Sequence, residues 1–101
     1  MGKLRVQQSE FMLALGHLIL YAYSIGYELT GGDLWALRGH KENSKHYKRL
    51  AIDLNLFKEG EYLTDTEAHR PLGEYWEKLG GIWGGRFTNP DGNHYEWKEM
   101  S

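Results

Sequence analysis

Leu50-Ala51-Ile52-Asp53-Leu54-Asn55-Leu56-Phe57 is the clearest strand signal in the sequence, because apolar and polar residues alternate from Ile52 onward. This alternation predicts a strand with one buried face. The turn Lys58-Glu59-Gly60-Glu61 follows and leads into Tyr62-Leu63. We therefore expect a β-sheet in the middle of the chain, with Asp53 inside its main strand.

One helix is expected before this strand in the sequence and a second helix after it. The first runs from about Arg5 to Ser24 and ends near Gly26, since glycine readily adopts the left-handed conformation of a helix C-cap. The second begins after Thr64-Asp65-Thr66-Glu67, which has the spacing of a capping box, and ends at about Leu79. His69, near the start of this second helix, is expected to be exposed.

The remaining strand signals are short. They lie at Tyr27–Thr30, Ile82–Trp83 and His94–Trp97. The 101 residues suit one domain, residues 1–101, without linker or repeat. The sequence therefore predicts an α+β fold in which a small antiparallel sheet packs with two main helices.

Composition excludes several classes of protein. Hydrophobic residues make up 41% and charged residues 26%, an ordinary balance for a folded domain. The formal net charge is -2 and the basic residues are scattered, so we expect no nucleic acid partner. No cysteine is present, which leaves imidazole and carboxylate as the strong metal ligands.

The apolar stretch Phe11 to Tyr23 raises the question of a signal peptide or a membrane anchor. It is too short to span a bilayer, contains His17 and is followed by no small-residue cleavage site. We therefore expect a buried helix, no signal peptide and no stable membrane insertion.

Two segments carry candidate chemistry. In the first, His46 and Asp53 are seven residues apart and converge only if a loop leads into the strand. In the second, Asp91 precedes His94 by three residues, so that a carboxylate and an imidazole could flank one metal ion from a loop and a strand. Two imidazoles and one carboxylate form a catalytic type of zinc site, with the fourth position left to water.

These segments resemble a known family. Ser44, His46, Ala51 and Asp53 match the motif S-x-H-x-x-G-x-A-x-D of the VanY-type and phage-endolysin zinc peptidases, which are D-Ala-D-Ala carboxypeptidases and L-alanyl-D-glutamate endopeptidases. Arg49 stands where that family usually has glycine. The stretch Gly81 to Glu96 looks like the second block of the same family, in which an acidic residue lies three before the last zinc histidine.

The resemblance implies a fold like that of the D-Ala-D-Ala peptidases and hedgehog proteins. It also implies a zinc ion held by His46, Asp53 and His94, with Asp91 as the general base. An upstream arginine commonly stabilises the oxyanion in these peptidases, and Arg38 is the candidate here. The implied reaction is hydrolysis of a stem-peptide bond of peptidoglycan.

Three functions remain open on these residues. The first is an L-alanyl-D-glutamate endopeptidase of phage lysis, a monomer that stays in the host cytoplasm until it is released to the cell wall or periplasm. The second is a D-Ala-D-Ala carboxypeptidase or dipeptidase, which needs a cationic group for a free carboxylate. The third is a non-catalytic wall-binding or phage-assembly module that kept the metal.

Overall fold

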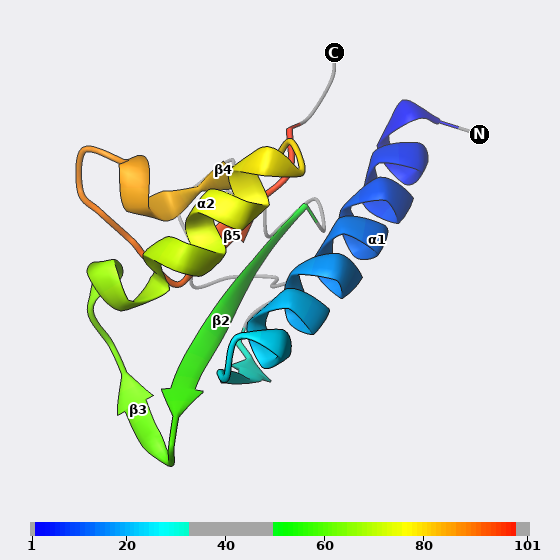
Figure 1. Ribbon diagram of the computed structural model, residues 1–101. Helices are drawn as coiled ribbons and strands as arrows, with labels where there is room; N and C mark the ends of the chain where they lie inside the picture. Colours follow the sequence, from blue (N-terminus) through cyan, green and yellow to red (C-terminus); the bar gives the residue numbers. More distant parts are fainter. Residues whose placement is uncertain (1, 33–49, 99–101) are drawn as a thin grey trace.

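The computed structural model describes residues 2–32 and 50–98, and it has two helices packed on a small antiparallel sheet (Figure 1). The predicted α+β class is confirmed. The helices and strands are α1 (Lys3–Ser24), β1 (Glu28–Gly31), β2 (Ala51–Lys58), β3 (Glu61–Leu63), α2 (Arg70–Lys78), β4 (Ile82–Trp83) and β5 (His94–Glu96). Two short 3-10 helices, η2 (Thr66–His69) and η3 (Gly84–Arg86), precede α2 and follow β4.

Strand β2 is the axis of the sheet. The strand order is β1-β2-β5-β4, and β3 also pairs with β2. Strand β5 pairs with the first part of β2, with Ala51 opposite Glu96, whereas β3 pairs with its last part, with Lys58 opposite Glu61. All these pairings are antiparallel.

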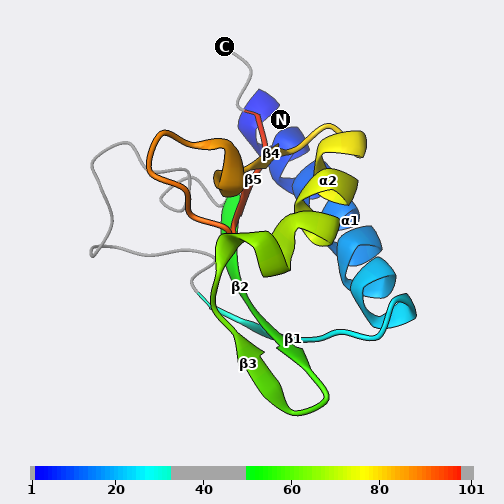
Figure 2. The same cartoon turned by 60° about the vertical axis from the view of Figure 1, so that its left-hand side comes forward.

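The two faces of β2 differ as the alternation predicts. Ile52, Leu54 and Leu56 are buried, whereas Asp53 and Asn55 between them are only partly buried. Both helices lie on the same side of the sheet, as the rotated view shows (Figure 2). The polar row of β2 therefore faces away from the helical layer.

Helix α1 packs on the sheet through an apolar stripe. Its buried residues include Phe11, Leu15, Leu18 and Ala22, which recur at helical spacing and so share one face. Gly26, just beyond the helix, has a φ of 95°, as predicted for the glycine near its end. No helix in the described part of the chain is long and apolar enough to cross a membrane.

The predicted capping box does not form. Asp65, not Thr64, is the N-cap of η2, and it makes no side-chain capping bond. Glu67 instead accepts two hydrogen bonds from the Arg70 guanidinium, at 2.9 and 2.6 Å. The capping box would need this carboxylate to accept from a backbone amide. It binds the Arg70 guanidinium instead, because a hydrogen bond between two charged groups is stronger than one to a neutral amide.

The expectation that His69 is exposed is also wrong. Its relative exposure is 2%, and its Nδ1 lies 2.8 Å from the hydroxyl of Tyr95 on β5. Tyr95 itself is fully buried beside Trp76. A hydrogen bond to a residue far along the chain therefore compensates for burying this imidazole.

Candidate metal centre and active site

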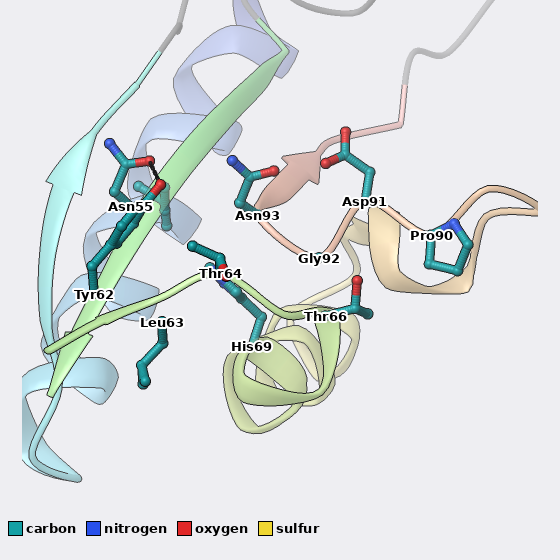
Figure 3. Close-up of a pocket in the computed structure, with 11 residues that line it drawn as sticks. Asn55, Tyr62, Leu63, Thr64, Thr66, His69, Pro90, Asp91, Gly92 and Asn93 are labelled. Carbon is teal, nitrogen blue, oxygen red and sulfur yellow. Dashed lines mark hydrogen bonds between the residues drawn. The ribbon is translucent and has the colours of Figure 1, made fainter.

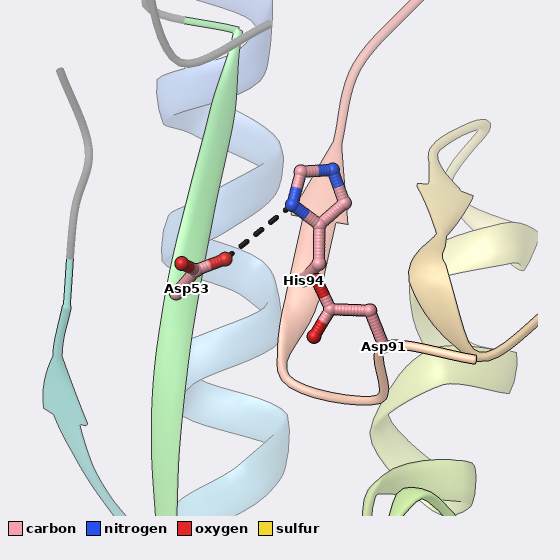
Figure 4. A group of neighbouring side chains, drawn as sticks. All are labelled: Asp53, Asp91 and His94. Atoms are coloured by element: carbon pink, nitrogen blue, oxygen red, sulfur yellow. Dashed lines mark ion pairs between the residues drawn. The ribbon is translucent and has the colours of Figure 1, made fainter. Parts of the chain in front are cut away.

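Asp53 and His94 are directly opposite each other in the pairing of β2 with β5. Side chains of such a pair project from the same face of the sheet. The Nδ1 atom of His94 lies 3.4 Å from Oδ1 of Asp53 (Figure 4). An imidazole and a carboxylate thus converge on the polar face of β2.

The backbone fixes Asp53 from both sides. On the β1 side, the Gly32 amide donates to the Asp53 carbonyl at 2.7 Å. On the β5 side, the Leu54 amide donates to the Asn93 carbonyl at 2.8 Å. Asp53 therefore sits in a strand that is paired along both edges, where its carboxylate has a well-defined position.

Asp91 belongs to a turn that is held by the residues around η3. The Asp91 amide donates to the Gly84 carbonyl at 2.9 Å, and the His94 amide donates to the Asp91 carbonyl at 3.1 Å. The indole of Trp83 donates to the Gly92 carbonyl at 2.8 Å. Trp83 is fully buried, and it is also a hydrogen-bond donor that anchors this turn.

A methyl group at Gly84 has no room, because it would lie 2.3 Å from the Asp91 carbonyl oxygen and 2.9 Å from Cβ of His94. The close approach of η3 to the turn therefore requires glycine. This packing explains why the glycine-rich segment lies next to the candidate site.

The turn brings Asp91 to the pair on the sheet. One ligand atom each from Asp53, Asp91 and His94 lie within 4.8 Å of one another, and Figure 4 shows the three side chains converging. Imidazole and carboxylate from a strand pair and a loop are the kind of donor set that zinc uses in catalytic sites. These residues therefore fit a metal ion.

Glu96 is a member of the site that the sequence analysis missed. Its Oε1 atom lies 2.8 Å from Nε2 of His94, and its side chain is 14% exposed. Histidines that bind metal commonly donate their second ring nitrogen to a carboxylate, which fixes the ring and the tautomer. The spacing His94-x-Glu96 was the available signal, since alternate residues of a strand share one face.

His94 is charged when no metal competes for its ring. Burial opposes the imidazolium, but the hydrogen bonds and charges of Asp53 and Glu96 prevail and raise the pKa of His94 to about 9. Because a metal binds the neutral ring, metal binding displaces this proton.

The other predicted site residues, His46 and Arg38, lie outside the described residues, as does Arg49. Among the predicted residues, the structure thus brings together Asp53, Asp91 and His94.

Comparison with known proteins identifies a family and a similar fold. The sequence profile of a family described as D-alanyl-D-alanine carboxypeptidase matches residues 38–97. The fold is similar to that in the crystal structure of the Serratia marcescens L-Ala D-Glu endopeptidase ChiX, with a TM-score of 0.71 and 15% sequence identity. The likeness covers 94% of this chain and 83% of that one. No curated protein matches the chain in sequence.

Proposed function

This chain belongs to the D-alanyl-D-alanine carboxypeptidase family of peptidases, and within that family we propose that it is a zinc-dependent endopeptidase of peptidoglycan. The bond that we propose is the one between L-alanine and D-glutamate in the stem peptide. The observation that carries the proposal is the convergence of Asp53, Asp91 and His94 within 4.8 Å on a fold similar to that of an L-Ala D-Glu endopeptidase.

In this proposal His46, Asp53 and His94 hold the zinc ion, and Glu96 orients the ring of His94 through the 2.8 Å contact at Nε2. With Nε2 engaged by Glu96, Nδ1, the nitrogen nearest Asp53, would be the atom of His94 that binds a zinc ion. When bound, zinc supplies Lewis acidity that polarises the scissile carbonyl and lowers the pKa of water toward about 7.

Asp91 acts as the general base. Its side chain is exposed, so water reaches the carboxylate, and its backbone is fixed by Gly84. A carboxylate oxygen of Asp91 takes the proton of the attacking water and passes it to the nitrogen of the leaving amine. Arg38 is proposed to stabilise the charge that develops on the carbonyl oxygen.

The family description names a carboxypeptidase, which makes removal of a terminal D-alanine the second candidate. A carboxypeptidase has to neutralise the free carboxylate of its substrate, normally with a lysine or an arginine. Among the described residues that line the recess beside Asp91, none is a lysine or an arginine. This observation favours the endopeptidase.

We further propose that the protein acts in phage lysis and stays in the host cytoplasm until a membrane partner lets it reach the wall. The motivation is the resemblance to phage endolysins. Expression in a Gram-negative host tests this proposal, with turbidity as the readout. Lysis should follow only when the inner membrane is permeabilised, and lysis without permeabilisation would contradict it.

The decisive experiment compares zinc-loaded wild type, Asp91→Ala and Glu10→Ala on purified Gram-negative-type peptidoglycan. Glu10 is an exposed carboxylate on α1 and serves as the matched control. We expect fragments cut between L-alanine and D-glutamate, identified by mass, from wild type and Glu10→Ala. Asp91→Ala should be slower by about 10²- to 10⁴-fold at equal zinc content. Wild-type protein that binds zinc and releases no fragment would refute the proposed function and favour a binding module.

A further inference from the structure

A recess of about 160 Å³ lies beside Asp91, between β3 and the turn that leads into β5. We call it the side pocket and define it by the lining residues Asn55, Tyr62, Thr64, His69, Asp91 and Asn93 (Figure 3). The position of the side pocket follows from the topology of the sheet. Strand β5 pairs with residues 51–53 of β2 and β3 with residues 56–58 on the same edge, so the two partners separate at Leu54 and Asn55.

The side pocket continues the polar face that carries the candidate metal centre. Asn55 follows Asp53 by two residues on β2 and so projects from the same face. Its carboxamide is fixed at both ends, because Nδ2 donates to Thr30 Oγ1 at 3.1 Å and Oδ1 accepts from the Tyr62 hydroxyl at 3.4 Å. A substrate held at Asp91 therefore has ordered hydrogen-bonding groups within reach on one side.

Apart from Asp91, the described lining of the side pocket is uncharged, and it combines polar groups with the apolar side chains of Leu54, Leu63 and Pro90. The described lining residues include amide, hydroxyl and imidazole groups and neither lysine nor arginine. Burial lowers the pKa of His69 to about 4, so this imidazole is neutral near pH 7. An anionic ligand in the side pocket would meet the carboxylate of Asp91 and no lysine or arginine among the described lining residues, whereas an uncharged ligand can form hydrogen bonds with the lining.

The size of the side pocket limits what it can hold. Pockets for drug-sized ligands occupy about 300–1,000 Å³. A volume of about 160 Å³ suits a single residue of an extended peptide. The ligand that fits best is therefore one short, uncharged and polar segment of a longer chain.

We propose that the side pocket binds the uncharged N-acyl-alanyl segment that precedes the cleaved bond, and that the carboxylate-bearing segment after the bond lies outside it. This proposal rests on the proposed function, since it takes the L-alanyl-D-glutamate bond as the substrate. In such a peptide the negative charge lies on the glutamate side, and the alanyl side is neutral once its amine is acylated. The side pocket, whose lining is uncharged apart from the general base Asp91, therefore suits the neutral alanyl side of the bond better than the negatively charged glutamate side.

The test measures binding by the zinc-loaded protein with two peptides whose scissile amide is replaced by an uncleavable ketomethylene group. One carries N-acetyl-alanine and the other N-succinyl-alanine, which adds a carboxylate on the alanyl side. We expect the acetyl peptide to bind at least about tenfold more tightly and to shift the amide NMR signals of Asn55, Thr64 and Asn93. Equal affinities, or shifts that avoid these residues, would overturn the proposal.

A variant with an added positive charge sharpens the test. Thr64 is exposed at the side pocket, so Thr64→Lys adds a cation there with little risk to folding, and Thr88→Lys makes the same change at an exposed position that does not line it. Thr64→Lys should shift the preference toward the succinyl peptide by about tenfold or more, and Thr88→Lys should not. An unchanged preference in Thr64→Lys would also overturn the proposal.

The two proposals fail separately in these experiments. Binding of the uncleavable peptides needs no catalysis, so acetyl-selective shifts in a protein that cuts nothing would support the pocket and refute the proposed function. Cleavage of peptidoglycan by a protein whose peptide preference ignores Thr64→Lys would support the function and refute the pocket.

Discussion

Asp53 and His94 face each other across β2 and β5, with Nδ1 of His94 3.4 Å from Oδ1 of Asp53. The two residues are 41 positions apart in sequence and meet because both strands present these residues on the polar face of the sheet. The candidate metal centre is thus built on paired backbone, which holds side chains more precisely than an open loop does.

Asp53→Asn should weaken zinc binding by at least about 100-fold, because the carboxamide keeps the shape of the side chain and removes its charge. Competition with a chromophoric chelator measures the affinity. Asp65→Asn, an exposed acid outside the cluster of Asp53, Asp91 and His94, should bind zinc as wild type does. Wild-type affinity in Asp53→Asn would contradict a role as ligand.

Glu96→Ala should weaken zinc binding by about 10- to 100-fold, the usual effect of removing a carboxylate that orients a metal-binding histidine. Glu96→Gln should lose less, because its amide oxygen can still accept the hydrogen bond from Nε2 of His94. Nitrogen NMR of the His94 ring tests the mechanism, since the alanine variant should show a mixture of tautomers. Equal affinities in wild type and both variants would show that Glu96 does not orient the ring.

Gly84→Ala should destabilise the fold by about 1–3 kcal/mol, because the added methyl group would lie 2.3 Å from the Asp91 carbonyl oxygen. It should also lower activity, since the shift of the turn moves Asp91 relative to Asp53 and His94. Denaturant unfolding and peptidoglycan hydrolysis provide the two measurements.

The matched control for this glycine is Gly16→Ala. Gly16 lies within α1, and apart from its chain neighbours and the adjacent helix backbone no atom lies within 4 Å of the position that a Cβ would take. Alanine there should stabilise the protein by about 0.5–1 kcal/mol through helix propensity. A Gly84→Ala variant as stable and active as wild type would show that the turn accommodates the methyl group.

The sequence predicted those parts of the fold that local patterns determine. Alternation in Ile52 to Phe57 defines β2, and the helical spacing of Phe11, Leu15 and Leu18 defines the buried face of α1. The spacing of Asp91 and His94 likewise predicted a turn and a strand at one site, and the structure has both.

Contacts between distant residues account for what the sequence did not predict. Burial of His69 depends on its hydrogen bond with Tyr95, 26 residues away. The capping box does not form because the Glu67 carboxylate binds the Arg70 guanidinium. The side pocket lies where the strand that pairs with β2 changes from β5 to β3. Predicting it would have required knowledge of this pairing. Local patterns carry no information on such pairings.

His69 should make the stability of the protein fall between about pH 6.5 and pH 4. Burial lowers the pKa of His69 from 6.5 to about 4, although the nearby charge of Asp65 favours the protonated ring. The neighbouring Tyr95 hydroxyl stays neutral, because burial raises the pKa of Tyr95. Below pH 6.5 the unfolded chain therefore binds a proton that the folded chain excludes, so the free energy of unfolding decreases as the pH falls. The loss reaches up to about 3 kcal/mol at pH 4.

Urea unfolding across this pH range, with wild type beside His69→Asn and His17→Asn, isolates the contribution. Asparagine at position 69 can still hydrogen-bond to the Tyr95 hydroxyl but does not titrate, so its stability should depend less on pH, whereas replacement of the exposed His17 should leave the wild-type dependence intact. The paired carboxylates Glu67 and Glu77, whose pKa values are lowered by Arg70 and Arg86, lose their contribution only below about pH 4.5. A difference between wild type and His69→Asn that stays constant from pH 7 to pH 4 would therefore show that His69 does not remain neutral in the folded protein.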